Sequence, residues 1–220
     1  MNGPSNPEDL PTIPYDLDDE LMKLTRGDHQ PRVRVYPWQG VAVVIGRGGK
    51  QHLELDRTAI AADGLPLYKR PGGGCAVVLD PGNIIVSVVL PLPGLSGITT
   101  AFGAISSWLA EALGQLDLGP VVQRGVSDLV VGDRKIGGSC IYRTRNLLYY
   151  STTLLVQPDL DLVDRYLPHP PREPDYRRGR RHRDFMGQLA WEGKTSELAS
   201  KLQNGLSEGL ATLSESLKDV

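Results

Sequence analysis

The chain has 220 residues, of which 40% are hydrophobic and 23% charged, and its formal net charge is −2. That length fits one medium domain, and the nearly balanced charge argues against a protein whose main role is to coat nucleic acid. Its two cysteines, Cys75 and Cys140, lack metal-type spacing and are too few for a disulfide scaffold, which favours a reducing compartment.

The chain begins with a polar, acidic and proline-rich stretch, which is not a secretory signal. We expect residues 1–14 to be a disordered tail and residues 15–220 to form one domain. The longest apolar run, residues 84–92, is interrupted by a serine and a proline and is far shorter than the roughly 20 residues that span a bilayer. We therefore expect a cytoplasmic protein with no membrane or nucleic-acid partner.

Helical periodicity and runs of apolar residues bounded by turn residues predict the elements in chain order. We expect a helix over 16–24, strands over 32–38 and 41–46, a helix over 53–62, strands over 75–80 and 84–90, a helix over 98–113, strands over 121–125, 127–131, 135–144 and 147–156, and a helix over 195–217. Short loops between successive strands favour antiparallel hairpins. The predicted fold class is α+β, with a mixed, largely antiparallel sheet of about eight strands flanked by helices.

The first candidate site lies in residues 67–83, where Arg70 comes shortly before three consecutive glycines at 72–74. Three glycines let the backbone approach a ligand closely, and their N–H groups can form a concavity for an anion. Arg70 can bond a carboxylate or phosphate through two nitrogens. A plain glycine-rich hairpin turn would give the same pattern, and the nearby residues 46–51 do not have the spacing of a P-loop.

A second candidate site lies in residues 124–156. Asp128 precedes one predicted strand, and Lys135 is followed by two glycines. A lysine beside small residues at the start of a strand can project into a cavity, although a lysine in a surface turn is the commoner case.

A third candidate is the segment 168–185, which holds six arginines and two histidines among several prolines. The prolines indicate a loop. This loop either meets phosphate or an acidic partner, or is a solvated or nucleic-acid-touching patch.

In their order and spacing, these segments resemble the lipoate–protein ligase A family, within the superfamily of biotin and lipoate ligases and octanoyltransferases. The resemblance rests on KRPGGGCAVVLDPGN followed by SDLVVGDRKIGGS, and it extends from the first predicted helix to residue 167. It implies an ATP-dependent ligase that activates lipoate or octanoate as an acyl-adenylate, with Mg²⁺, and transfers the acyl group to a lysine of a carrier protein. That carrier would be a lipoyl domain or a protein like the H-protein.

The resemblance also implies roles for individual residues. Lys135 would be catalytic, contacting both the acyl carbonyl and the phosphate, and Asp128 would hold Mg²⁺. Three arginines, Arg178, Arg180 and Arg181, would belong to a loop that covers the adenylate. The residues implied to bind substrate or adenylate are Arg70, Gly72, Gly73, Gly74, Cys75, Asn83, Ser127, Asp128, Gly137, Gly138 and Thr152.

The chain departs from the family pattern at three points. Ser127 stands where the family usually has Asn, and Tyr150 and Ser151 replace a His-Gly pair before Thr152. A C-terminal accessory domain is missing, which implies a separate small accessory subunit.

Three other functions remain open: an acyltransferase working through a cysteine thioester, a biotin–protein ligase, and a non-catalytic lipoate-binding relative. For the transferase, both cysteines could lie near the pocket, although small cysteines are more often buried packing residues.

Overall fold

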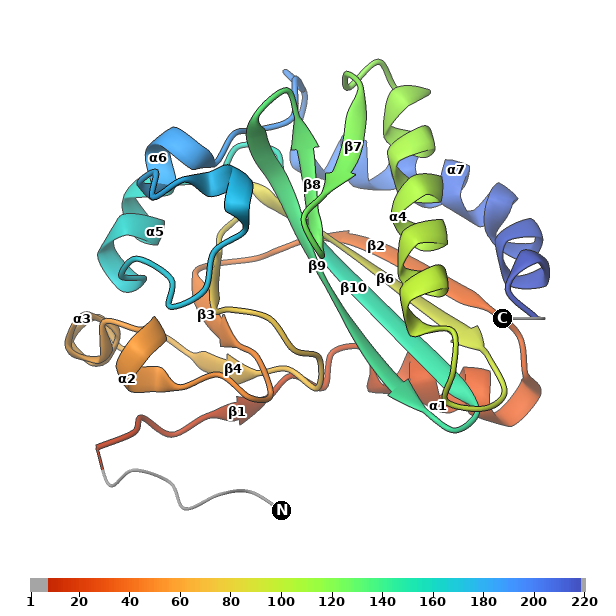
Figure 1. Cartoon of the computed structure of the whole chain (residues 1–220), viewed down its shortest axis with the longest axis horizontal. Helices are drawn as coiled ribbons and strands as arrows, with labels where there is room; N and C mark the ends of the chain where they lie inside the picture. The colour runs from red at the N-terminus through yellow and green to blue at the C-terminus, as the bar shows by residue number, and fades with distance from the viewer. Residues whose placement is uncertain (1–7, 219–220) are drawn as a thin grey trace.

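The computed structural model describes residues 8–218, and its ten strands form two sheets (Figure 1). The larger sheet comprises β2 (Arg32–Pro37), β6 (Asn83–Pro91), β7 (Val121–Arg124), β8 (Asp128–Val131), β9 (Arg134–Thr144) and β10 (Leu147–Leu155). It is antiparallel throughout, in the order β2-β6-β10-β9-β8-β7. The smaller sheet comprises β1 (Ile13–Pro14), β3 (Ala42–Ile45), β4 (Leu67–Lys69) and β5 (Val77–Leu79), in the order β1-β4-β3-β5. Two of its pairings are parallel, so the predicted α+β class with a mixed, largely antiparallel sheet is confirmed.

Two long helices, α4 (Ile98–Gly114) and α7 (Thr195–Ser216), cover one face of the larger sheet (Figure 1). Each turns a stripe of apolar residues inward at intervals of three or four, such as Phe102, Ile105 and Leu109 in α4. Burying one such side chain contributes roughly 1.5–3 kcal/mol, so this face forms the main core. Both helices were predicted from that periodicity.

The smaller sheet is buried on both faces. One face joins the larger sheet through Tyr15, Trp38 and Ile85, among others. The other face packs against α3 (Arg57–Ala62) and α5 (Leu160–Tyr166). Buried residues on both faces explain why β3 reads as a continuous apolar run and not as an alternating one. Over residues 8–218, none of the helices combines the length and apolar composition needed to cross a bilayer.

Two predicted helices need correction. The helix expected over 53–62 is broken into α2 (Gln51–Glu54) and α3, because the Asp56 carboxylate accepts a hydrogen bond from the Ala59 amide at 2.9 Å and caps a new helix. The first helix, α1 (Asp19–Asp28), begins three residues later than expected and continues further. The short elements β1, β4, α6 (His182–Phe185) and the 3₁₀ turn η1 (Asp175–Arg177) have too few residues to show a period and were not predicted.

The predicted tail also needs correction over residues 8–14. The Leu10 backbone exchanges two hydrogen bonds with the Gln51 side chain, at 2.8 and 2.9 Å, and Ile13–Pro14 pair with β4. These partners satisfy the backbone of a segment whose composition alone suggested disorder. The remainder of the predicted tail, residues 1–7, lies outside the described residues.

Candidate active site

The floor of the site is the hairpin formed by β8 and β9. A register shift after Leu129 places Asp128 opposite Gly138 and Val130 opposite Lys135. The Lys135 ammonium lies 2.7 Å from Asp128 Oδ1. A β-carbon at Gly138 would lie 3.0 Å from the Lys135 nitrogen, so the glycine leaves the space that the ammonium occupies. The hairpin therefore presents one cation, held by one carboxylate.

The wall of the site is the glycine bend that links β4 to β5. The Arg70 guanidinium donates to the carbonyls of Gly73 at 2.8 Å and Cys75 at 2.7 Å and so holds the bend together, and Arg70 also lines a small chamber beside the bend. A β-carbon at Gly46 would lie 2.4 Å from the Gly74 carbonyl oxygen, so two backbone segments meet where no side chain fits.

Floor and wall enclose a cavity of about 590 Å³, a size typical of small-ligand sites. A smaller chamber of about 110 Å³ shares Gly74, Cys75 and Lys135 with it and continues between the two sheets toward Tyr15 and Tyr149. The predicted residues that line the larger cavity are Gly73, Gly74, Cys75, Ser127, Asp128, Lys135, Gly137 and Gly138. The two segments that the sequence singled out thus face one space.

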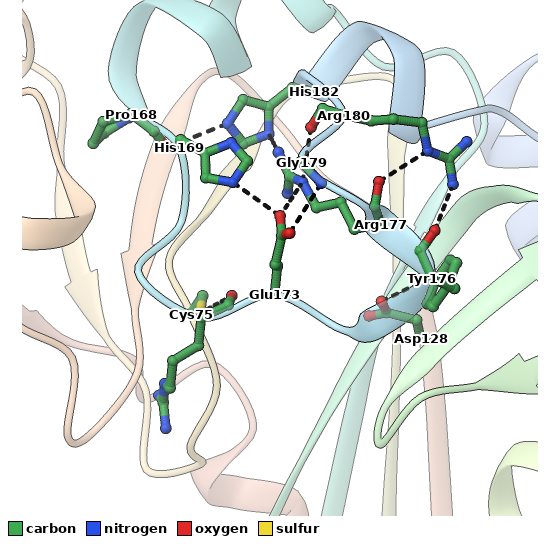
Figure 2. Close-up of polar contacts among 11 residues, drawn as sticks. Cys75, Asp128, Pro168, His169, Glu173, Tyr176, Arg177, Gly179, Arg180 and His182 are labelled. Atoms are coloured by element: carbon green, nitrogen blue, oxygen red, sulfur yellow. Dashed lines mark hydrogen bonds and ion pairs between the residues drawn. The ribbon is translucent and has the colours of Figure 1, made fainter.

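Residues 168–186, which include η1 and α6, cover the cavity and are called the roof. Figure 2 shows polar contacts inside the roof and from the roof to the floor. Arg180 reaches Asp133 at 2.9 Å, and the Tyr176 hydroxyl donates to Asp128 Oδ2 at 2.8 Å. The roof is therefore fastened to the hairpin that carries Lys135.

Glu173 is the centre of the polar contacts within the roof (Figure 2). Its carboxylate accepts from the Gly179 amide at 2.9 Å and lies 2.9 Å from the His169 ring and 3.5 Å from Arg177. Burial alone would raise the pKa of Glu173, but the bonds from Gly179 and His169 outweigh it and lower that pKa. Burial, and then the charge of Arg177, lowers the pKa of His182. The roof thus holds a carboxylate and a neutral imidazole around one guanidinium.

The arginine that faces the cavity, Arg177, is not one of the three predicted for this loop. Arg178 and Arg181 are exposed, and Arg180 serves as the link to Asp133, so none of the three lines the cavity. Arg177 does line it, with 4% of its surface exposed and its charge 4.8 Å from the centre of the Phe185 ring. Nothing in the sequence distinguishes Arg177 from its neighbours, because only the turn at η1 decides which arginine faces inward.

Three predicted binding residues line neither the cavity nor the smaller chamber. Asn83 is fully buried, and its side-chain Oδ1 accepts from the Asp80 amide at 3.0 Å within a turn. Thr152 faces the helices α4 and α7 and donates to the Gly138 carbonyl at 3.1 Å, whereas the next residue, Thr153, lines the cavity. Alternation along β10 explains the second error, since a shift of one residue exchanges the two faces of a strand. Gly72 is the third, and it packs on Cys140, because a β-carbon at Gly72 would be 2.7 Å from Cys140 Sγ.

The described residues do not fit a metal site held by the protein alone. No group of three or more His, Cys, Asp or Glu side chains suited to a metal ion occurs within residues 8–218. Both oxygens of Asp128 are engaged, one by Lys135 and the other by Tyr176. The prediction that Asp128 holds Mg²⁺ therefore finds no support in this geometry.

Both cysteines line the cavity. Burial raises the pKa of Cys140, which disfavours the thiolate that a nucleophile needs. The Cys75 thiol lies 3.8 Å from the Arg172 carbonyl oxygen in the roof.

Comparisons with known proteins agree with this architecture. A family model described as the lipoyl protein ligase A/B catalytic domain matches residues 11–207. A Mycoplasma genitalium protein named "Probable lipoate-protein ligase A" is 30% identical over 152 residues, which are 69% of this chain and 44% of that protein. The chain thus spans about half the length of the curated relatives it matches.

Two solved structures share the fold. One is a lipoate-protein ligase A bound with ATP, with a TM-score of 0.73 and 23% identity over 94% of this chain and 90% of that one. Another belongs to a bi-partite lipoate protein ligase studied with its E2 lipoyl domain from Thermoplasma acidophilum, with a TM-score of 0.73 and 21% identity over 94% and 88% of the two chains. With its two sheets, its glycine bend and the family match over most of its length, this chain belongs to the lipoyl protein ligase A/B catalytic-domain family.

Proposed function

We propose that this chain is the catalytic unit of an ATP-dependent lipoate–protein ligase, acting in the cytoplasm on lipoate or octanoate. The observation that carries this proposal is the shared cavity: the Lys135 ammonium, the glycine bend and the Arg177 guanidinium all line it. Two cations and a wall of backbone amides suit a reaction in which two anions must meet. The names of the curated relatives support the same activity.

In the first step, a carboxylate oxygen of the fatty acid forms a bond to the α-phosphorus of ATP, and pyrophosphate leaves. The two reactants repel each other, and a unit positive charge at ~4 Å offsets about 4 kcal/mol of that repulsion at an effective dielectric constant of ~20. Lys135 can supply this charge from the floor and Arg177 from the roof. Mg²⁺ would enter as the counterion of ATP, because residues 8–218 hold no cluster of side chains suited to bind it.

In the second step, the neutral amine of a carrier lysine attacks the acyl carbonyl, and AMP leaves. A lipoyl domain or a protein like the H-protein is the proposed carrier. The bi-partite ligase from Thermoplasma acidophilum supports the further proposal that a separate small subunit assists this chain. We further propose that residues 15–220 act as one catalytic domain.

Mass spectrometry tests the reaction. The chain is incubated with a candidate carrier, ATP, Mg²⁺ and lipoate, octanoate or biotin, with and without an accessory subunit. We expect the carrier to gain the mass of one lipoyl or octanoyl group only when ATP is present. Acylation from an acyl-carrier thioester without ATP, a gain with biotin alone, or tight lipoate binding without any exchange of pyrophosphate into ATP would each contradict the proposal.

A thioester-dependent acyltransferase is the second candidate, because Cys75 and Cys140 both line the cavity. A double variant, Cys75→Ser with Cys140→Ser, separates the two functions. A ligase retains ATP-dependent acylation in this variant, whereas a transferase loses its activity and never needs ATP.

A further inference from the structure

We propose that Tyr176 is a positioning residue for the Lys135–Asp128 pair, so that a seated roof sets the direction of the ammonium. This inference rests on the proposed function, which assigns the chemistry to Lys135. Tyr176 is not among the residues that sequence patterns or the family resemblance pointed to.

The contact joins the roof to the reacting pair directly. The Tyr176 hydroxyl donates to Asp128 Oδ2 at 2.8 Å, while Lys135 lies 2.7 Å from Oδ1 of the same carboxylate. Asp128 is buried, with 7% of its surface exposed, so water does not compete freely for its oxygens. Each oxygen therefore has its own donor, and the carboxylate cannot turn both toward Lys135.

Packing of the Tyr176 ring, as well as the hydrogen bond to Asp128, sets the position of the hydroxyl. The centre of the Tyr176 ring lies 5.1 Å from the centre of the Phe185 ring. The Arg124 guanidinium lies over the Tyr176 ring, 4.5 Å from its centre. Burial, followed by the charge of Asp128, raises the pKa of Tyr176, so the hydroxyl keeps its proton and remains a donor. A phenylalanine at this position would keep the ring contacts and lose only the bond to Asp128.

Loss of that bond changes the electrostatics of Lys135 in a defined direction. With Oδ2 free, both oxygens of Asp128 are available to the ammonium, and the ion pair closes more tightly. A tightly paired ammonium offers less of its charge to the substrate carboxylate and phosphate. Tyr176 therefore acts through Asp128, and it does so only when η1 is seated over the floor.

The test compares Tyr176→Phe with Tyr142→Phe, a matched control whose hydroxyl makes no hydrogen bond to any residue in the described part of the chain. We expect kcat for lipoate-dependent pyrophosphate exchange to fall about tenfold in Tyr176→Phe, the factor for one hydrogen bond to a charged group. The KM for ATP should change less than about threefold, and tryptic cleavage at the roof arginines less than about twofold, because the ring still packs. Tyr142→Phe should behave like the unchanged chain.

A second pair of variants shows whether the effect passes through Asp128. In an Asp128→Asn background, Tyr176→Phe should lower kcat less than about twofold, since a residue that acts through another shows no separate effect once that partner is altered. Equal losses in both backgrounds, a change in KM alone, or faster cleavage of the roof would overturn the proposal and leave a purely structural role.

A readout without turnover separates this inference from the proposed function. Trace acetylation with acetic anhydride, followed by mass spectrometry, measures how readily Lys135 reacts, with exposed Lys69 as the internal reference. We expect Lys135 to react about threefold more slowly in Tyr176→Phe, because a closer carboxylate favours the charged amine. An unchanged or faster rate would overturn the inference. If the unchanged chain exchanges no pyrophosphate at all, the proposed function fails, and the acetylation rates still decide this question.

Discussion

The floor and the roof of the cavity are built in different ways. The floor residues Asp128 and Lys135 stand on strands whose backbones are paired on both sides. The roof has only one turn of 3₁₀ helix and one of α-helix. A single backbone bridge between Met186 and Lys135 ties its end to the floor, and the rest is fastened by side chains such as Arg180 and Tyr176. Backbone ladders open only with a large part of the fold, whereas such side-chain fastenings open locally. We therefore expect changes in the floor to affect the chemical step and changes in the roof to affect binding and access.

Replacing Lys135 by Ala should have the largest effect. We expect pyrophosphate exchange to fall a hundredfold or more, because the cation that meets the developing charge is lost. Circular dichroism and the unfolding midpoint should show a folded chain, since Tyr176 still bonds Asp128. Lys69→Ala, which changes an exposed lysine on β4, serves as the control. Near-normal exchange in Lys135→Ala would show that Lys135 is not needed for the proposed reaction.

Replacing Arg177 by Met should have the next largest effect. Methionine keeps the packing on Phe185 but removes the charge of the roof, so we expect the KM for ATP to rise about tenfold with a smaller change in kcat. Steady-state exchange kinetics measure both constants. Arg178→Met changes an exposed neighbour in the same way and should leave them unaltered; similar losses in the two variants would mean that general basic charge matters and not the inward arginine.

Replacing Arg180 by Gln should loosen the roof and leave the floor unaffected. The variant loses the ion pair with Asp133 at 2.9 Å and the bond to the Asp133 carbonyl at 3.0 Å. It also loses three bonds to roof carbonyls, at 3.1, 3.1 and 3.3 Å. Hydrogen exchange followed by mass spectrometry should show amides of the roof exchanging two- to fivefold faster, the range for an exposed pair, with β8 and β9 unchanged. Arg181→Gln is the control, because that side chain is 83% exposed. Equal acceleration in floor and roof would show that the two open together.

Acidification should give the smallest effect, and it too should act on the roof. Burial lowers the pKa of His182 in the folded state, so below its ordinary value of about 6.5 the unfolded chain binds more protons than the folded one. The contribution of His182 to stability is therefore complete above that value and declines as the pH falls through it. We expect the urea midpoint to drop less between pH 7.5 and 5.5 in His182→Gln than in the unchanged chain. His52→Gln changes an exposed histidine and serves as the control. If it reduces the drop in the urea midpoint as much as His182→Gln does, the assignment to His182 is contradicted.

Local sequence patterns were sufficient for the long elements, whereas the joining of the two motifs in one site came from the family resemblance. The α4 and α7 stripes and the strands β6, β9 and β10 follow from periodicity and turn residues, because those signals repeat over many residues. The glycine bend was visible because only glycine permits such close backbone contact. The assignment of Lys135 to a cavity came from the resemblance, since a lysine in a surface turn was the commoner expectation.

Contacts between distant segments were not readable from the sequence. Whether Arg177 or Arg178 faces the cavity depends on one turn at η1, and whether Thr152 or Thr153 does so depends on the register of β10 against β9. The Asn83 side chain bonds the backbone of its own turn, and the Arg70 guanidinium bonds backbone carbonyls of the bend.

The sequence by itself determined the α+β class, the long helices and strands, and the two motifs that meet at the cavity. Only the tertiary structure decided which side chains point inward, that Lys135 and Tyr176 each engage one oxygen of Asp128, and that Tyr176 reaches it across 48 residues. The physical reason is range: propensity and periodicity act between neighbours in the chain, whereas the direction of a side chain is set by whatever the fold packs against it.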